Sequence, residues 1–287
     1  MKIGFVLNRE FEDGHFEDMV DREIEVLEKE TEYEGVKLYH DRYLMHPELF
    51  LDSEALFFHC KDYALAKELE SKGQRVINDS TSVFTFDSKV LTELLFRELS
   101  IQHPKTIIEP NYFDLNNRIS TEVYYNKLKL ELGDNFLIKE EYGSSGKGID
   151  EIKTYNDFKR VLTSTKYRVI FQEKIGKPPY KDYRLAFIED TFIGGYSREN
   201  ESNVVTSTFS GGHFVDSEIP DEIIQFGESI MKRLKSFGLT FAGLDILVDK
   251  SGSLLISEVN TNFNMAKIER RAGVSFEKKL FSRLLKE

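Results

Sequence analysis

The sequence predicts an α/β protein, and three observations support this fold class. Apolar strands alternate with amphipathic helices over the first 80 residues, which is typical of a parallel open sheet. Residues 169–287 contain many short apolar runs and one amphipathic helix, which favours a mixed sheet covered by helices over a sandwich. Hydrophobic residues make up 40% of the 287 residues, with 23 Phe and 13 Tyr, so the chain can bury sizeable cores.

The first predicted unit, residues 1–85, is a small open α/β domain. It opens with a strand at Lys2–Leu7. A helix follows in which apolar residues recur at helical spacing, namely Phe16, Val20, Ile24 and Leu27. The alternation continues with a strand at Ala55–His59, a helix at Ala64–Leu69 and a strand at Arg75–Ile77.

The second predicted unit, residues 86–168, resembles a lid. Asp87 or Ser88 can cap its first helix, which carries apolar residues as far as Leu99. A strand at Lys105–Ile108 follows, and after a polar segment come a strand at 135–139, a glycine-rich turn and a helix near 157–162. Two strands around a glycine-rich turn leave the backbone free to approach a ligand closely.

The third predicted unit, residues 169–287, is rich in strands. Its predicted strands are Val169–Glu173, Tyr183–Ile188, Thr191–Tyr196, Val204–Phe209, Leu244–Val248 and Leu254–Val259. The helix that interrupts them has its apolar face at Ile223, Ile224, Ile230, Met231 and Leu234.

Composition excludes some classes of function. The chain has 50 acidic and 39 basic residues and no long basic run, so it is not expected to bind duplex nucleic acid. The single cysteine, Cys60, excludes an intramolecular disulfide framework and fits a buried strand-end residue in a reducing compartment. No apolar stretch is long enough to span a membrane. We therefore expect a cytoplasmic protein without membrane partners, and a homodimer as the default assembly.

A glycine-rich loop is the first candidate ligand site. Lys139 ends an apolar strand, and Gly143, Gly146 and Gly148 follow within a few residues. Backbone N–H groups in such a loop can surround phosphate oxygens while a lysine supplies a point charge. The alternative is an ordinary hairpin turn, because Gly and Ser are common in turns. The loop does not match the P-loop pattern.

A second candidate site lies on two strands joined by a turn at residues 249–252. Strand alternation predicts that Ile256, Glu258 and Asn260 share one face, with Asp245 on the neighbouring strand. Two carboxylates and an amide oxygen suit Mg²⁺ bound to nucleotide phosphates. The alternative is a solvated acidic face, but these residues interrupt strongly apolar strands, where an unpartnered charge is costly.

Taken together, these motifs resemble the ATP-grasp ligases, especially the RimK-like branch. The resemblance runs in the same order along residues 77–268 and is carried by Lys89 after an Asp, Lys139 before the glycine loop, the Phe171–Ile175 segment, Asp182-Tyr183-Arg184, Arg198, and Asp245 with Glu258-Val259-Asn260. It implies an ATP-grasp fold with an N-terminal open α/β domain, a central lid domain and a C-terminal mixed-sheet domain with the metal site. It also implies ATP and Mg²⁺, expected as two ions, as cofactors.

The resemblance assigns roles residue by residue. Lys89 and Lys139 match the lysines that contact phosphates. The residues that match the flexible phosphate lid are Ser145, Gly146, Lys147 and Gly148. Gln172, Glu173 and Ile175 match the hinge that reads adenine, and Asp182 matches the residue that holds ribose. Asp245, Glu258 and Asn260 match the metal ligands. Arg184 and Arg198 are our candidates for holding the acceptor carboxylate and stabilising the tetrahedral intermediate.

One segment departs from the family pattern. RimK-like glutamate ligases carry an Asn shortly before a Gly-Gly pair, whereas this chain has Thr206-Ser207-Thr208-Phe209-Ser210 before Gly211-Gly212. His213 and Asp216 follow directly and are candidates for a general base, with a solvent-exposed loop as the alternative.

The resemblance implies an ATP-dependent carboxylate ligase that forms an acyl phosphate and then an amide or ester bond. The altered segment favours a peptide macrocyclase similar to the graspetide ligases, which join Asp or Glu to Thr, Ser or Lys side chains of a precursor peptide. One alternative is an amino-acid ligase of the glutamate-adding type. Another is a nucleotide-binding module without turnover, which the retained lysines, arginines and metal ligands disfavour.

Overall fold

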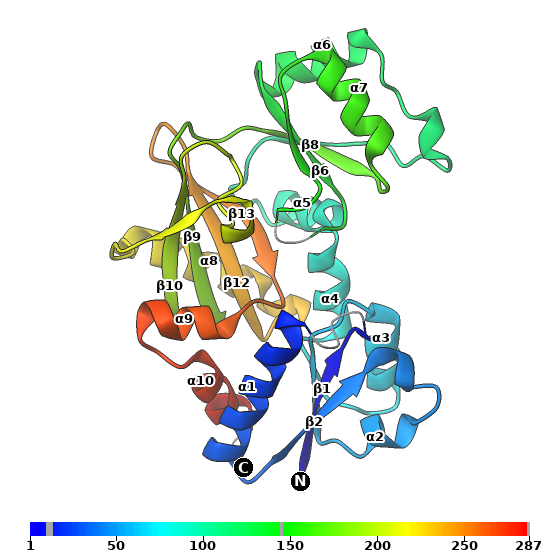
Figure 1. Cartoon of the computed structure of the whole chain (residues 1–287), viewed down its shortest axis with the longest axis vertical. Helices are drawn as coiled ribbons and strands as arrows, with labels where there is room; N and C mark the ends of the chain where they lie inside the picture. The colour runs from blue at the N-terminus through cyan, green and yellow to red at the C-terminus, as the bar shows by residue number, and fades with distance from the viewer. Residues whose placement is uncertain (10–13, 144–145, 286–287) are drawn as a thin grey trace.

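The computed structural model describes residues 1–9, 14–143 and 146–285, which form three sheets (Figure 1). The N-terminal unit lies at the bottom of that view, the unit around β6 and β8 at the top, and the C-terminal sheet between them on the left. The predicted α/β class is confirmed. Within the described residues, no helix is both long and apolar enough to cross a bilayer.

The N-terminal sheet is parallel, with strand order β2-β1-β3-β4. Its elements are β1 (Lys2–Leu7), α1 (His15–Glu30), β2 (Glu34–Tyr39), α2 (Pro47–Leu51), β3 (Ala55–Phe58), α3 (Tyr63–Ser71) and β4 (Val76–Ile77). The sequence analysis missed β2, an edge strand whose apolar and charged residues alternate over only six positions. Cys60 is buried as predicted, and burial raises the pKa of its thiol to about 12.

Two helices, α4 (Ser80–Asp87) and α5 (Lys89–Glu98), connect the N-terminal unit to the rest of the chain. Of the two predicted caps, Ser88 is the one observed: its hydroxyl accepts from the Leu91 N–H of α5 at 3.2 Å. Helix α4 was not expected from the sequence. Phe96 of α5 packs into the same apolar cluster as Leu244 of the C-terminal sheet, although the predicted boundaries place α5 in the central unit.

The lid sheet is antiparallel, with strand order β5-β8-β6-β7. Its elements are β5 (Thr106–Ile108), α6 (Glu122–Leu132), β6 (Phe136–Glu140), β7 (Ile149–Ile152), α7 (Tyr155–Ser164) and β8 (Val169–Glu173). Strand β8 lies between β5 and β6, so the boundary predicted at 168/169 is wrong because it divides this sheet. Helix α6 occupies the segment that the sequence analysis described only as polar.

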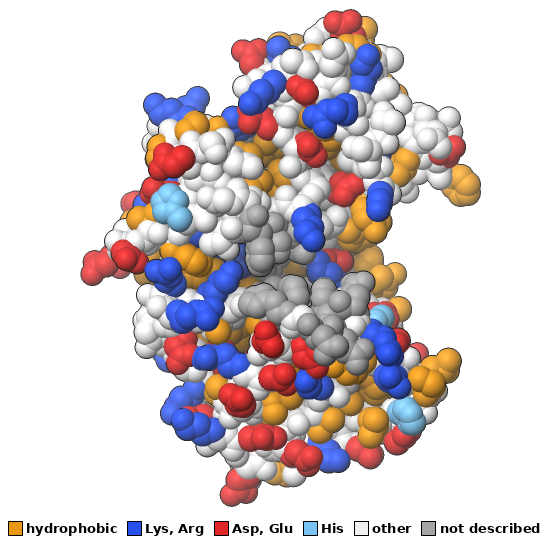
Figure 2. Space-filling view, in the orientation of Figure 1, with side chains coloured by type: hydrophobic (Ala, Val, Ile, Leu, Met, Phe, Trp, Pro, Cys, Tyr) orange, Lys and Arg blue, Asp and Glu red, His pale blue; other side chains and the backbone are white. Residues whose placement is uncertain are grey.

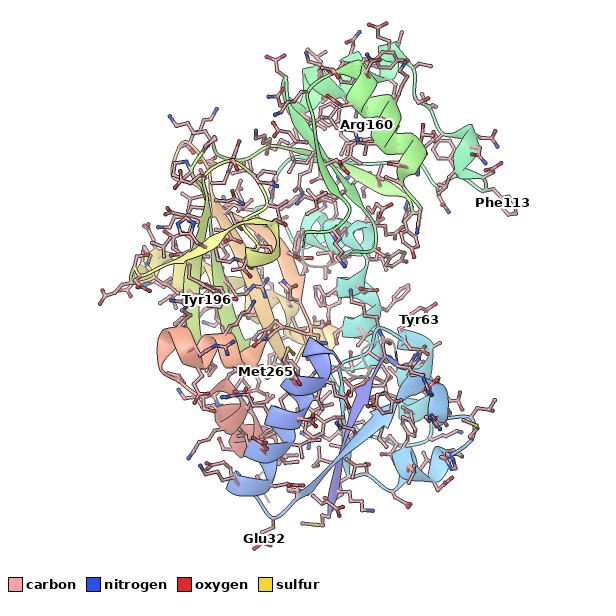
Figure 3. The ribbon with its side chains drawn as sticks, in the orientation of Figure 1. Glu32, Tyr63, Phe113, Arg160, Tyr196 and Met265 are labelled. Carbon is pink, nitrogen blue, oxygen red and sulfur yellow. The ribbon has the colours of Figure 1, made fainter. Side chains whose placement is uncertain are left out.

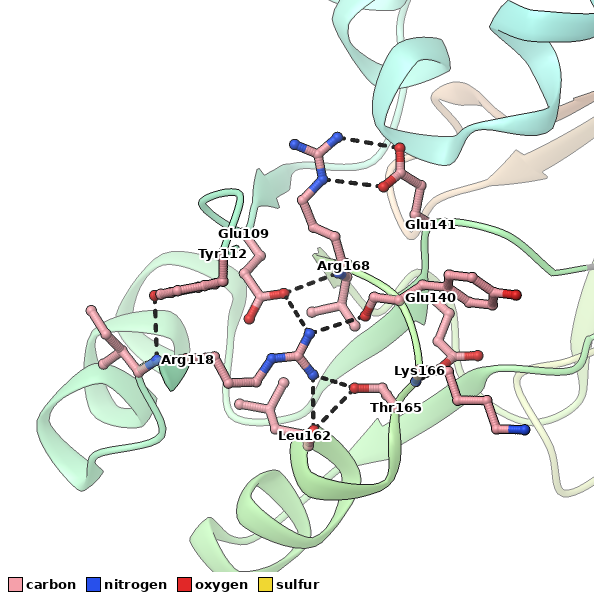
Figure 4. A network of polar contacts seen from close by, with 12 residues as sticks. Glu109, Tyr112, Arg118, Glu140, Glu141, Leu162, Thr165, Lys166 and Arg168 are labelled. Atoms are coloured by element: carbon pink, nitrogen blue, oxygen red, sulfur yellow. Dashed lines mark hydrogen bonds and ion pairs between the residues drawn. The ribbon is translucent and has the colours of Figure 1, made fainter. Parts of the chain in front are cut away.

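A buried arginine joins the first loop of the lid to α7 (Figure 4). Arg118 donates to Glu109 Oε2 at 3.1 Å and to Leu162 O at 2.8 Å, and it also contacts Thr165. Glu109 Oε2 accepts a second bond from the Val169 N–H at 3.1 Å, at the start of β8. These bonds attach the long β5–α6 connection to the sheet, because a buried guanidinium must satisfy its donors.

The C-terminal sheet has strand order β11-β10-β9-β12-β13, and all its pairs are antiparallel, where a mixed sheet was expected. Its elements are β9 (Tyr180–Ile188), β10 (Thr191–Asn200), β11 (His213–Val215), α8 (Asp221–Leu234), β12 (Phe241–Val248), β13 (Leu254–Asn260), α9 (Met265–Ala272) and α10 (Phe276–Leu284). The predicted strand at Val204–Phe209 is wrong: residues 204–207 are irregular and Thr208–Ser210 is a 3-10 helix. Helices α9 and α10 were not expected from the sequence either.

The last helix attaches the C-terminal unit to the N-terminal sheet. Phe281 of α10 meets the rings of Phe57 and Phe5 edge-on, at centroid distances of 5.4 and 6.3 Å. Arg22 of α1 donates to Glu277 of α10 at 3.2 Å and also contacts Glu269 of α9. The N-terminal unit therefore shares one apolar core with the C-terminal sheet.

Candidate active site

A cavity of about 570 Å³ lies between the lid sheet and the C-terminal sheet. The predicted site residues that line it are Lys89, Lys139, Gly146, Gln172, Glu173, Ile175, Asp182, Arg184, Arg198, Asp245, Glu258 and Asn260. The structure thus brings together residues from helix α5, from strands β6 and β8 of the lid, and from strands β9, β10, β12 and β13 of the last unit. Lys147, Gly148, His213 and Asp216 are not among the lining residues, and Ser145 lies outside the described residues.

Two lysines enter the cavity from different elements. Lys89 opens α5, and its Nζ donates to Gly143 O at 3.0 Å and lies 3.9 Å from Glu258 Oε1. Lys139 of β6 is only 8% exposed, and burial lowers its pKa to about 8 although the charge of Glu258 opposes this shift. A buried cation of this kind is stabilised when an anion enters the cavity. The pair can therefore neutralise phosphate oxygens.

A buried carboxylate fixes the position of the first lysine. Glu141 accepts from the Ser88 hydroxyl at 2.6 Å and from Arg168 Nε at 3.2 Å (Figure 4), while its carbonyl accepts from the Lys89 N–H at 3.0 Å. The cap of α5 is thereby tied to the end of strand β6. Because Lys89 follows the cap directly, these bonds hold its backbone at the cavity edge.

The glycine loop contacts the segment after β10. Gly146 has φ +80°, and a Cβ built on it would lie 2.4 Å from Val205 Cγ1. Both residues line the cavity, together with Thr206 and Ser207. Only glycine combines this backbone conformation with this close approach. The irregular segment that replaced a predicted strand therefore forms part of the cavity wall. Lys147 is exposed and Gly148 packs on Glu140.

The predicted hinge lies at the end of β8. Gln172 is buried and donates from Nε2 to Thr106 Oγ1 at 2.9 Å. Glu173 accepts the Lys105 N–H at 2.6 Å, and Ile175 lies on the loop beyond the strand. These bonds hold the end of β8, where the chain passes from the lid to the C-terminal sheet, against β5. Residues such as Leu137 and Ile170 supply an apolar wall of the cavity.

Two arginines and two aspartates form a buried ionic cluster on β9, β10 and β12. Arg184 donates from Nη2 to Asp245 Oδ2 at 2.6 Å and from Nε to the other oxygen. Arg198 donates from Nε to Asp182 Oδ1 at 2.9 Å and from Nη2 to Asp245 Oδ1 at 3.0 Å. Burial raises the pKa of Asp245, but the charges of Arg184 and Arg198 outweigh it and hold the pKa below its ordinary value.

Asp182 has a clear structural role in this cluster. Both of its carboxylate oxygens accept from Arg198, and its side chain is 6% exposed. Bidentate pairing of this kind fixes the plane of a guanidinium. Asp182 therefore orients Arg198, and its contact with ribose stays a prediction.

The three predicted metal ligands lie on adjacent strands. Asp245 pairs with Glu258 and Gly243 pairs with Asn260 in the β12–β13 ladder. A register shift after Asp245 pairs Ile246 with Ile256, which joins the apolar cluster of Leu244. Ile256 therefore does not share the face of Glu258, because the bulge reverses the alternation that the sequence analysis assumed.

The donor set fits a hard divalent cation. Two carboxylates and an amide supply oxygen ligands, which Mg²⁺ prefers, and cavity-lining lysines can hold the phosphates that complete its coordination. In the part of the chain that the structure describes, no three His, Cys, Asp or Glu side chains cluster as a metal site by themselves. An ion at this position would therefore depend on Asp245, Glu258 and Asn260 together with a bound nucleotide.

The predicted general base is not in the cavity. His213 of β11 is exposed, while its neighbour Phe214 lines the cavity. Asp216 has a side chain that is 95% exposed and pairs with Arg271 at 3.3 Å on the surface. The structure therefore supports the exposed-loop alternative, because alternation along β11 directs Phe214 rather than His213 inward.

Sequence reasoning missed a third cation at the arginine end of the cavity. Lys267, in the first turn of α9, lines the cavity, and its Nζ lies 6.0 Å from the ring centre of Phe214. Burial lowers its pKa, and the charges of Arg198 and Arg184 lower it further. In Figure 3 the start of α9 (Met265) lies near Tyr196 of β10, and Figure 2 shows Lys and Arg side chains gathered over this region. The cap Asn264 and the terminal Gly273 could have revealed α9.

Comparison with known proteins identifies related chains. A family model described as a RimK-like ATP-grasp domain matches residues 87–284. The alpha-aminoadipate–LysW ligase LysX of Saccharolobus solfataricus is 30% identical over 230 residues, covering 74% of this chain and 78% of that protein. The coenzyme gamma-F420-2:alpha-L-glutamate ligase of Methanococcus maripaludis is 22% identical over 83% of this chain and 78% of that protein.

Solved structures share the whole architecture. D-alanine–D-alanine ligase from Bacillus anthracis has a TM-score of 0.76 at 18% identity, with 99% of this chain and 96% of that chain covered. The ATP-grasp ligase PsnB complexed with a minimal precursor has a TM-score of 0.68 at 17% identity, with 99% and 98% covered. At this identity the likeness concerns the fold.

Proposed function

The chain belongs to the RimK-like ATP-grasp family and is an ATP-dependent ligase, and on this premise we propose that it activates a carboxylate as an acyl phosphate and joins it to the amine of an acidic acceptor. Ligases of this family use ATP with Mg²⁺. One observation carries the proposal: the same cavity is lined by the lysine pair Lys89 and Lys139 and by three further cations, Arg184, Arg198 and Lys267.

The reaction would proceed in two balanced steps. A carboxylate oxygen of the first substrate attacks the γ-phosphorus of ATP, and the bond to ADP breaks. The acceptor nitrogen then attacks the acyl carbon, the bond to phosphate breaks, and the nitrogen loses a proton. Divalent ions held by Asp245, Glu258 and Asn260, which we expect to number two, would offset charge on the phosphate oxygens.

The side chains of the cavity have distinct parts in this scheme. Lys89 of α5 and Lys139 of β6 bind phosphate oxygens, and the segment of Gly146 covers them. Gln172, Glu173 and Ile175 border the adenine. Arg198, held by Asp182, and Arg184 present fixed N–H groups to the oxygen that gains charge during attack on the acyl carbon. Donors fixed before the reaction stabilise such charge most effectively.

The acceptor is proposed to be an acidic amino acid or a peptide that carries one. The names of two relatives specify an acidic amino acid, α-aminoadipate and L-glutamate. Arg184, Arg198 and Lys267 place three cations at one end of the cavity, which suits an acceptor with carboxylates of its own.

A second candidate is the peptide macrocyclase that the sequence analysis favoured. PsnB, which shares the fold, has been solved with its precursor peptide. Thr206, Ser207 and Thr208 of the altered segment line the cavity, so this departure from the family pattern reaches the site. In that case a side chain of the same peptide would replace the free acceptor.

Measurement of ADP release with different combinations of substrates would distinguish the two candidate functions. The purified protein, ATP and Mg²⁺ are combined with glutamate or α-aminoadipate and with acidic peptides, separately and together, and intact masses are recorded. Gain of one residue per ADP supports amino-acid ligation. Loss of about one water per ADP from a peptide alone supports macrocyclisation. ADP release that leaves every organic mass unchanged would contradict both proposals.

A further inference from the structure

His59 and Asn78, which follow strands β3 and β4 of the N-terminal sheet, hold the segment that comes after β13 in the sequence. His59 follows β3, and its carbonyl accepts from Asn262 Nδ2 at 3.0 Å. Asn78 follows β4, and its Nδ2 donates to Thr261 O at 3.1 Å. Carboxyl ends of neighbouring parallel strands share one edge of a sheet, so both residues reach the same short segment.

The ring of His59 connects this segment to α1. Its Nδ1 lies 3.3 Å from Asn262 Oδ1, and its Nε2 lies 2.9 Å from Glu23 Oε2. The bond from Asn262 Nδ2 to the His59 carbonyl fixes the amide, so its oxygen faces the ring and Nδ1 carries a hydrogen. The contact between Nε2 and the carboxylate needs a second proton. Both side chains are almost fully buried, at 3% and 1% exposure.

The pair lies directly behind the cavity wall. Met19 and Glu23 are one turn apart on α1 and therefore share a face, and Met19 lines the cavity together with Asn262. Within the described part of the chain, neither Glu23 oxygen has a hydrogen-bond donor of good geometry, so the His59 ion pair is its main compensation. A carboxylate buried in this way is costly without such a partner.

We propose that the Glu23–His59 pair is a positioning device for the acceptor end of the cavity. It holds Asn262, and with it residues 261–264, against the N-terminal unit. Phe263 and Asn264 of this segment line the cavity beside Asn260. A wall fixed in this way orients the acceptor toward the acyl group, and small displacements of reacting groups reduce rates strongly. That this end of the cavity receives the acceptor rests on the proposed function. The contacts of His59 with Glu23 and Asn262 do not depend on it.

Amide hydrogen exchange tests the positioning directly. In His59→Gln and Glu23→Gln, exchange at residues 261–264 is expected to be about tenfold faster than in the unaltered protein. Glu109→Gln is the matched control: Glu109 is also a buried carboxylate, 2% exposed, but it lies in the lid unit and contacts Arg118. Unchanged exchange in both variants, or an equal increase in the control, would overturn the proposal.

Two further measurements keep the test decisive. If His59→Gln does not fold, Asn262→Ala removes the same contacts from the cavity side and is expected to give the same faster exchange; unchanged exchange there would contradict the proposal. With an acceptor identified, His59→Gln is expected to raise its KM about fivefold and leave the KM for ATP unchanged. An equal rise in both KM values would indicate a general structural role. The exchange result stands even if the acceptor is not the one proposed.

Discussion

Arg184 binds both carboxylate oxygens of Asp245, and it does so across the central β9–β12 pair of the C-terminal sheet. A residue expected to ligate metal is thus held by a residue expected to bind the acceptor. Arg198 reaches the same carboxylate at 3.0 Å, so Asp245 is fixed by two guanidinium groups. The nucleotide end and the acceptor end of the cavity are therefore one connected ionic structure, which supports the following predictions.

Glu258→Gln is expected to abolish turnover without unfolding the protein. The change removes one negative charge from the proposed metal site, whereas the side chain is 38% exposed and supports little of the core. ADP release is expected to fall more than about 100-fold, with the circular dichroism spectrum unchanged. Asp249→Asn, in the exposed turn between β12 and β13, is the control. Turnover near normal in Glu258→Gln would refute the metal role.

Arg198→Lys is expected to lower turnover about 100-fold and to leave the KM for ATP within about threefold. Lysine keeps the charge but cannot make the two parallel bonds to Asp182. Arg198→Ala is a less clean variant, because it leaves buried carboxylates uncompensated at a cost of about 3 kcal/mol. Steady-state kinetics with varied ATP measures the difference. A selective loss of ATP binding would place Arg198 in the nucleotide site instead.

Lys139→Met is expected to abolish nucleotide binding and to stabilise the empty protein. Burial lowers the pKa of Lys139 to about 8 from 10.5, so its charge costs roughly 3 kcal/mol of folding free energy at pH 7. Because the folded pKa is depressed, the cost is fully present below about pH 8 and disappears as pH rises through the unfolded value. Urea unfolding at pH 7 and pH 10 should show that Lys139→Met is more stable than the unaltered protein at pH 7 and that this difference is smaller at pH 10. Equal free energies of unfolding for Lys139→Met and the unaltered protein at pH 7 would contradict the predicted cost of the buried charge.

Gly146→Ala is expected to weaken ATP binding more than backbone strain alone would explain. Its Cβ would meet Val205, whereas a Cβ on Gly133, also at positive φ, would meet nothing within 4 Å. Each change should cost about 1 kcal/mol of stability. Calorimetric titration with an ATP analogue should show weaker binding only for Gly146→Ala. The same loss in Gly133→Ala would mean that the Val205 contact has no part in binding.

The contribution of His59 to stability is expected to depend on pH. Burial lowers its pKa, but Glu23 and Asn262 outweigh burial and the pKa is raised overall. Glu277 of α10 acts on Glu23 from the other side and is itself paired with Arg22. A raised folded pKa means that the stabilisation is complete below about pH 6.5 and is lost as pH rises through the folded value. Urea unfolding of the unaltered protein and His59→Gln at pH 6 and pH 9 should show a smaller difference at pH 9.

The sequence predicted the strands better than the helices between them. Strands β1, β3, β6, β8, β12 and β13 were expected from apolar runs, and the structure contains them. Helices α4, α6, α9 and α10 were missed, although Asp79, Thr121, Asn264 and Ser275 cap them. In α6 the apolar residues do not keep to one face, so the helical period is weak. Helix α9 is amphipathic but only 8 residues long. Packing on the sheets therefore stabilises both.

By itself, the sequence predicted residues whose types and order suit a nucleotide, a metal ion and an acceptor carboxylate, and most of them line one cavity. It could not determine that Asp182 orients Arg198, that a bulge turns Ile256 away from Glu258, or that His213 points out while Lys267 faces in. Those relations depend on ladder register and helix docking, and others join residues far apart in the sequence, such as His59 and Asn262, which are 203 positions apart. Only the tertiary structure decides them, because local propensity does not specify which distant surfaces meet.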